Sequence, residues 1–177
     1  METYNLSNAR VYVSTYEKHN KGSLYGKWLT LSDYSDKEEF YAACRELHKD
    51  EKFPKFMFDN WEFIPSSLIG ESYLYECIFD LIEELEELDD TEQEAFYVWL
   101  NYKSIDFTKK DAYDLIRIFK DDYMGKYDEY EDFAYMIIEE CYPEIDDFTK
   151  TYFDYSKYAM DLFTSDYYFD NGFVFKR

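Results

Sequence analysis

The stretch ESYLYECIFDLIEELEELDD, from Glu71 to Asp90, decides how the chain is divided. Its apolar residues recur with the spacing of one helix face: Leu74, Cys77, Ile78, Leu81, Ile82, Leu85 and Leu88. Nine of the twenty residues are acidic, and they occupy most of the other positions. The pattern predicts a strongly amphipathic helix that begins near Glu71 and turns its carboxylates to solvent.

The acids of this stretch are dense enough to be compared with a nucleic-acid backbone. On a continuous helix with a rise of about 1.5 Å per residue, nine acids in twenty residues are spaced roughly 3.3 Å apart along the axis. One strand of DNA carries a phosphate about every 3.4 Å. A solvated face on a highly charged protein has the same pattern, so the sequence leaves both interpretations open.

The charge of the whole chain is strongly negative and unevenly distributed. The net charge is −21, with 9 basic and 11 acidic residues in 1–70 against 10 and 29 in 71–177. The later acids are interleaved with Tyr, Phe, Leu and Ile, which predicts folded structure in place of a disordered acidic tail. This charge argues against direct binding to nucleic acid or to an anionic membrane, and it favours basic protein partners.

The N-terminal part has the pattern of a small α+β domain. Residues 11–16 and 27–31 are β-branched or aromatic runs separated by a turn-rich stretch, which predicts two paired strands. An N-cap within 35–39 precedes a helical stripe that reaches Leu47. A third extended run, 55–64, stops at Pro65. Residues 1–66 are therefore predicted to form the first domain.

The rest of the chain is predicted to be mainly helical. Thr91-x-x-Glu94 has the form of a capping box for a second helix, and residues 67–107 contain twelve acids and one base. Within 108–177, Thr108 is the expected cap of a third helix, Asp128 or a neighbour begins a fourth, and a further helix covers 155–163. Asn171-Gly172 between aromatic runs predicts a β-hairpin.

These patterns predict an α+β fold in three parts. An N-terminal antiparallel sheet with a helix (1–66) is followed by an acidic helical part (67–107) and by C-terminal helices with a small antiparallel sheet (108–177).

Sites for metal or catalysis are weakly supported. Cys44 and His48 are four residues apart and could supply half a zinc site, but the sequence has no second pair at ligand spacing. Neither His19 nor His48 stands beside a nucleophile in a recognisable motif. We expect no cofactor, no metal and no enzyme activity. A carboxylate-based hydrolase is an alternative that would require two converging acids of raised pKa.

Three cysteines in unrelated segments and the absence of an apolar run of about 18 residues indicate a soluble, cytoplasmic protein.

Several motifs resemble those of one known family. Tyr16-x-x-His19-Asn20-x-Gly22-x-Leu24-x-Gly26-x-Trp28 resembles the opening signature of the ArdA antirestriction family. The family's second half is similar, in the same order, to Tyr123-x-Gly125-x-Tyr127-x-x-Tyr130-Glu131-Asp132-Phe133-Ala134, Tyr152-Phe153-Asp154-Tyr155-x-x-Tyr158-Ala159-x-Asp161-Leu162 and Gly172-Phe173-Val174-Phe175. The resemblance covers almost the whole chain.

The resemblance implies a protein of a mobile genetic element, such as a conjugative transposon or plasmid, that imitates bent double-stranded DNA. Such a protein occupies the DNA-binding groove of type I restriction-modification enzymes. The family's proteins are elongated, three-part homodimers whose C-terminal parts touch. This chain departs from the family in 55–61, which is less acidic than expected, so the N-terminal part is predicted to contribute less to the imitation.

The candidate partner-binding residues are acids placed to imitate phosphates. They are Glu76, Asp80, Glu83, Glu84, Glu87, Asp90, Glu94, Asp114, Asp121, Asp122, Asp128, Glu129, Glu131 and Asp132. The expected partners are a type I restriction-modification enzyme and a second copy of the chain, without nucleic acid or membrane. An acidic chaperone or adaptor for basic DNA-associated proteins is the alternative function.

Overall fold

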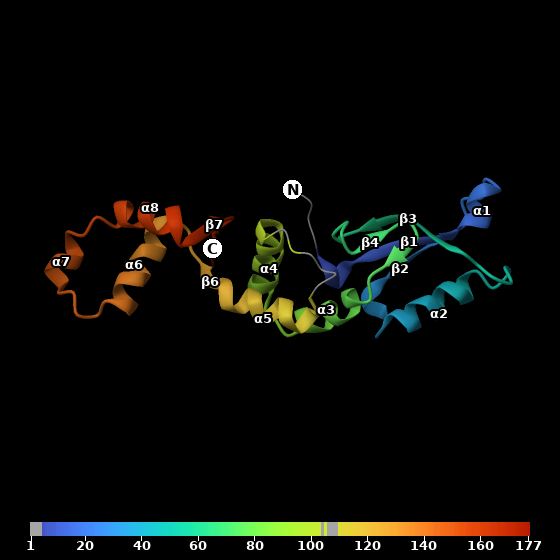
Figure 1. Ribbon diagram of the computed structural model, residues 1–177, viewed down its shortest axis with the longest axis horizontal. Coiled ribbons are helices and arrows are strands. Elements are labelled where there is room, and N and C mark those ends of the chain that lie inside the picture. The colour runs from blue at the N-terminus through green and yellow to red at the C-terminus, as the bar shows by residue number, and fades with distance from the viewer. Residues whose placement is uncertain (1–4, 104, 106–109) are drawn as a thin grey trace. The chain divides into compact units, whose positions relative to one another are not determined.

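A computed structural model of the protein describes residues 5–103, 105 and 110–177, and they adopt the predicted α+β fold (Figure 1). The chain forms two compact units. Of the described residues, the first unit contains those within 1–93 and 104–117, and the second contains those within 94–103 and 118–177. The division into three domains stays a prediction.

The first unit contains the predicted N-terminal sheet. Strand β1 (Arg10–Thr15) lies between β2 (Lys27–Thr30) and β3 (Phe56–Glu62), and both pairings are antiparallel. Single 3₁₀ turns, η1 (Leu6–Asn8) and η2 (Leu31–Asp33), flank the sheet. A short helix that the sequence did not predict, α1 (Tyr16–Asn20), follows β1, and the Thr15 hydroxyl caps it by accepting a bond from the Lys18 N–H.

Helix α2 (Lys37–Leu47) covers this sheet and begins where the sequence predicted (Figure 1). The Asp36 carboxylate accepts a hydrogen bond from the Glu39 N–H, so Asp36 is the N-cap. Phe40 is fully buried on the inner side of the helix, and its ring centre lies 6.1 Å from that of Phe58 in β3. Aromatic contacts therefore attach the helix to the sheet.

The prediction that a helix begins near Glu71 is wrong for its first residues. Residues 69–74 form a small hairpin, β4 (Ile69–Gly70) paired with β5 (Tyr73–Leu74), and helix α3 runs only from Cys77 to Glu86. The Glu71 carbonyl accepts a bond from the Phe58 N–H at 2.8 Å, and the Leu68 carbonyl accepts one from Tyr75. These backbone bonds outweigh the helical spacing of the apolar residues. Leu74 is still buried, but it belongs to strand β5 and not to a helix.

The second helix of the acidic region exists, but its cap is not the predicted one. Helix α4 (Asp90–Lys103) begins after Asp89, whose carboxylate accepts a bond from the Glu92 N–H at 2.8 Å. The Glu92 carboxylate in turn accepts a bond from the Asp89 N–H. The capping box is therefore Asp89 with Glu92, and the predicted box of Thr91 with Glu94 lies two residues too late.

Helix α5 (Ala112–Asp122) is the third predicted helix. The predicted cap, Thr108, lies outside the described residues. Asp111 occupies the cap position, and its carboxylate accepts a bond from the Asp114 N–H at 2.7 Å. In the second unit, Phe119 of this helix packs between Phe96 and Trp99 of α4, with ring centres 5.4 and 5.8 Å away.

The second unit also contains the C-terminal sheet and three helices. Strand β8 (Phe173–Lys176) lies between β6 (Tyr123–Lys126) and β7 (Tyr167–Asp170), in antiparallel pairs. Helices α6 (Tyr130–Cys141) and α8 (Tyr155–Ser165) are joined through the short α7 (Asp147–Thr151), as Figure 1 shows. The core residues are Phe133, Ala134, Ile137, Ala159, Leu162 and Val174.

The predicted C-terminal hairpin is confirmed. Asn171 and Gly172 connect β7 to β8 with φ angles of 52° and 85°. Positive φ at both central residues is the requirement of the tight turn that Asn-Gly favours. Strand β6, which completes the sheet, was not predicted.

The observed cap of α4 leads to a stability prediction. We expect Asp89→Ala to lower the free energy of unfolding by about 1 kcal/mol, because the Glu92 N–H loses its acceptor. Asp90→Ala removes the same charge without removing a cap, and Thr91→Ala removes the wrongly predicted cap; both should change stability by less than about 0.5 kcal/mol. Urea unfolding of the three variants measures these values, and equal losses for Asp89 and Asp90 would contradict the assignment.

Candidate partner-binding surface

Helix α3 separates its apolar and acidic residues onto different sides. Ile78, Leu81, Ile82 and Leu85 are buried in the first unit. Positions three and four apart lie above one another on a helix, so Asp80, Glu83, Glu84 and Glu87 form one stripe. Asp80, Glu83 and Glu87 are exposed and Glu84 is partly exposed. We call these four residues the α3 stripe.

The length of the helix changes the estimate of charge density. Glu71 lies in the β4–β5 hairpin and Asp90 begins a different helix, so neither belongs to this face. From Asp80 to Glu87 the helix axis advances about 10 Å, and the stripe places four carboxylates along it. The density of one charge per 3 to 4 Å that the sequence predicted is therefore kept, but over a shorter length.

The acids of the α3 stripe lack cationic partners among the residues that the structure describes. The same holds for Glu76, which precedes the helix. With no lysine or arginine paired to them, these carboxylates present their full charge to a partner.

Several acids near the N-terminal sheet, unlike those of the α3 stripe, form ion pairs with bases. Glu62 pairs with Arg10 at 2.6 Å, Asp50 with Lys18 at 2.8 Å, and Glu46 with Lys49 at 2.6 Å. Each pair cancels a negative charge locally. That the N-terminal part contributes less to the imitation of DNA stays a prediction, and these pairs favour it.

The predicted acids of α4 and α5 are partly committed to internal bonds. The Asp122 carboxylate accepts a bond from the Trp99 indole at 2.8 Å and pairs with Lys103 at 3.1 Å. Glu94 pairs with Lys126 at 3.4 Å, and Asp114 pairs with Arg117 at 3.2 Å. Asp90 and Asp121 are exposed. Three of these predicted acids, Glu94 and Asp122 of the second unit and Asp114 of the first, are therefore neutralised at least in part by bases of the same unit.

The predicted acids that precede or begin α6 also have structural roles. Glu129 and Asp132 form its capping box, in which the Asp132 carboxylate accepts a bond from the Glu129 N–H. Asp128, Glu129 and Asp132 are exposed, whereas Glu131 is partly exposed. Capping does not bury these carboxylates, so they still add to the negative field at the protein surface.

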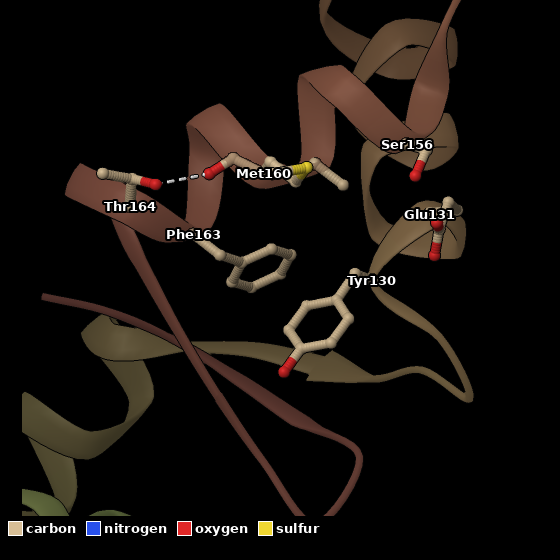
Figure 2. A pocket seen from close by; sticks show the side chains of 7 residues that line it. Tyr130, Glu131, Ser156, Met160, Phe163 and Thr164 are labelled. Carbon is tan, nitrogen blue, oxygen red and sulfur yellow. Dashed lines mark hydrogen bonds between the residues drawn. The ribbon is translucent and has the colours of Figure 1, made fainter.

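Glu131 borders a hollow of about 310 Å³ between α6 and α8 (Figure 2). Tyr130, Phe163 and Met160 supply most of its apolar wall, and the rings of Tyr130 and Phe163 meet edge to face at 5.0 Å. Ser156 and Thr164 are at its edge, where the Thr164 hydroxyl donates to the Met160 carbonyl. The hollow suits an apolar side chain better than an ion.

A second hollow, of about 410 Å³, borders the α3 stripe in the first unit. Glu83 and Glu86 of α3 line it together with Asp33, the last residue of η2, and Glu39, in the first turn of α2. Asp33, Glu39 and Glu86 were not among the predicted partner-binding residues. Helical spacing could have identified Glu86, but only folding brings it close to Asp33 and Glu39.

Cys44 and His48, the pair considered for a metal, are both fully buried. The His48 Nδ1 lies 3.0 Å from the Lys18 ammonium, and its Nε2 lies 3.3 Å from the Val13 carbonyl. Both ring nitrogens therefore have partners inside the protein. Burial, followed by the charge of Lys18, lowers the pKa of His48, and burial raises the pKa of the Cys44 thiol to about 12.

Two further properties of the described residues bear on possible sites. Their His, Cys, Asp and Glu side chains form no group of three or more that could hold a metal ion. None of the described helices is long and apolar enough to cross a lipid bilayer.

Comparison with known proteins gives a match over nearly the whole chain. The model of the antirestriction protein family ArdA matches residues 11–175. No curated protein matches the chain.

The environments of the cysteines predict unequal reactivity. Cys141 is exposed, whereas Cys44 is buried with a raised pKa, and the thiolate is the reactive form. At pH 8 we expect a disulfide reagent such as dithionitrobenzoate to modify Cys141 rapidly and Cys44 only after unfolding. Peptide mapping after timed labelling, with Cys141→Ser as the control, measures this order. Rapid labelling of Cys44 in the folded protein would contradict its burial.

Proposed function

The chain belongs to the ArdA antirestriction family, and from this premise we propose that it inhibits type I restriction-modification enzymes by imitating bent double-stranded DNA in their DNA-binding groove. The observation that carries the proposal is the α3 stripe, whose carboxylates have no cationic partner among the described residues. Enzymes that bind DNA hold the phosphate backbone with lysine and arginine side chains. A stripe of unpaired carboxylates offers the lysine and arginine side chains of such an enzyme negative charges at a spacing similar to that of DNA phosphates.

The inhibition requires binding but no chemistry. The protein competes with DNA by mass action, and its net charge of −21 accelerates the encounter with a positively charged groove. Competition of this kind depends on ionic strength, because salt screens exposed charges over about 10 Å at 0.1 M. The proposal places the protein in the cytoplasm, where the enzyme meets its DNA.

We include homodimerisation through residues 108–177 in the proposal. Large apolar side chains are exposed in this part, including Tyr135, Phe148, Tyr152 and Met160. Phe148 and Tyr152 also contact each other, with ring centres 4.9 Å apart, and adjoining exposed apolar groups are typical of a protein interface. Two copies would double the negative charge that one enzyme meets.

The α3 stripe gives a direct test of the function. We expect Glu83→Lys/Glu84→Lys/Glu87→Lys to weaken competition with DNA for a purified type I methyltransferase on the order of 100-fold, because each reversal replaces an attraction with a repulsion of similar size. The measurement is the inhibitor concentration that displaces half of a labelled DNA carrying the enzyme's site, over a range of salt concentrations.

The matched control is Glu17→Lys/Glu38→Lys/Glu46→Lys. It changes the net charge equally, but its residues lie on α1 and α2, where Lys21 and Lys49 already pair with two of them. An equal loss in both variants would show that only net charge matters and would contradict the stripe. The alternative function, an acidic adaptor for basic proteins, would be supported if the wild-type protein displaced no DNA and instead captured small basic proteins from host lysate in a pull-down.

The oligomeric state is tested separately. We expect sedimentation equilibrium of the wild-type protein to give twice the mass of one chain, because apolar surface in residues 108–177 is covered on association. A single-chain mass at micromolar concentration would contradict the homodimer and leave the DNA competition untouched.

A further inference from the structure

The hollow between α3 and the start of α2 has a definite composition. Its lining residues are Ser32, Asp33, Tyr34, Ser35, Glu39, Phe79, Ile82, Glu83 and Glu86, all within the first unit. Phe79, Ile82, Glu83 and Glu86 are spaced by three or four residues, so they form one side of α3 beside the α3 stripe. The other wall comes from residues 32–39.

The floor of this hollow is apolar and its edge is acidic. Phe79 and Ile82 are only 4% and 5% exposed, and the Phe79 ring is held by Phe40 at a centre distance of 6.0 Å. Tyr34 is partly buried and also contacts the Phe40 ring, at 5.5 Å. The four acids of the hollow are exposed, so a ligand that enters meets carboxylates first and aromatic surface below them.

The carboxylates at this edge are available and partly fixed in position. The Glu39 carboxylate accepts bonds from the N–H and the hydroxyl of Ser35, both at 2.8 Å. These two bonds lower the pKa of Glu39, so it stays ionised. Among the described residues, Asp33, Glu39, Glu83 and Glu86 have no basic partner. Four like charges without a cation disfavour one another, and a cation entering the hollow would relieve this repulsion.

We propose that this hollow receives an arginine side chain of the inhibited enzyme, one that contacts DNA when DNA is bound. The inference rests on the proposed function and assigns a specific contact to it. The planar guanidinium can lie against the partly exposed Tyr34 ring, above the buried Phe79, while its N–H groups donate to Glu83, Glu86 and Asp33.

Arginine fits this hollow better than lysine does. A guanidinium is weakly hydrated, stacks on aromatic faces and donates in several directions, whereas an ammonium is a strongly hydrated point charge. The methylene stem of arginine can cover Ile82 as it enters. A recessed site of this kind imitates a groove of DNA, whereas the neighbouring α3 stripe imitates its phosphate backbone.

Two pairs of substitutions on α3 separate the hollow from general surface charge. Glu83→Gln/Glu86→Gln removes two acids that line the hollow, and Glu84→Gln/Glu87→Gln removes two that do not. Both pairs have the same spacing and the same change of charge. In the DNA competition assay, we expect the second pair to weaken inhibition modestly, because it removes two charges of the α3 stripe, and the first pair to weaken it at least about tenfold more, because it removes two charges that line the hollow.

Filling the hollow tests the entry of a side chain without changing any charge. Ser32→Trp adds a large neutral group to the lining, and Ser66→Trp adds the same group at an exposed position in the first unit outside it. We expect Ser32→Trp to weaken competition at least about tenfold while Ser66→Trp matches the wild type. The Ser32 hydroxyl donates a hydrogen bond to the Ser7 carbonyl, and Ser32→Trp removes this bond. Thermal unfolding of both variants is therefore measured to verify that they fold.

The outcomes distinguish this inference from the function on which it rests. Equal losses for the two glutamine pairs, or a Ser32→Trp variant that competes as well as Ser66→Trp, would overturn the arginine site while inhibition by the wild-type protein stood. Failure of the wild-type protein to displace DNA would overturn the proposed function and this site together. A folded Ser32→Trp variant with weak competition, together with a selective loss in Glu83→Gln/Glu86→Gln, supports the site.

Discussion

The burial of the apolar side of α3 is the constraint on which the anionic surface depends. Five residues of this helix are buried, and each contributes about 1.5–3 kcal/mol when it leaves water. Repulsion between carboxylates three or four positions apart costs only about 0.2–0.5 kcal/mol per pair. Burial therefore exceeds repulsion severalfold, and the helix can carry the α3 stripe without lysines to neutralise it. The packed side also determines which way the acids point.

The number of acids in a sequence is a poor measure of the anionic surface that it forms. Near the N-terminal sheet, acids such as Glu62 and Asp50 are paired with bases. In the second unit, Asp122 is bonded to Trp99 and Lys103, and Glu94 is paired with Lys126. The α3 stripe differs because its carboxylates have no such partners among the described residues. The α3 stripe therefore contributes more to the negative electrostatic field around the protein than its four acids would suggest from their number alone.

Local patterns predicted most elements correctly and failed where nonlocal bonds compete. The strands of the first sheet, α2, α6, α8 and the Asn171-Gly172 hairpin were all predicted from spacing and turn chemistry. The region from Glu71 to Glu76 was misassigned, because one backbone bond to β3 and the bonds between residues 68–70 and 73–75 hold it in a hairpin despite its helical spacing. The cap of α4 was misplaced because Thr91 and Asp89 both satisfy a capping pattern, and only the Asp89 carboxylate reaches the free N–H groups.

The sequence by itself determined the α+β class, the amphipathic character of α3 and the order of charge along it. These properties depend on residues within one or two helical turns of one another, where spacing dictates geometry. Tertiary structure alone decided that Asp33 and Glu39 join Glu83 and Glu86 around one hollow with an aromatic floor. These two pairs of acids are more than 40 positions apart in the chain, and they meet only because Phe79 packs on Phe40. Local periodicity in the sequence does not indicate that contact.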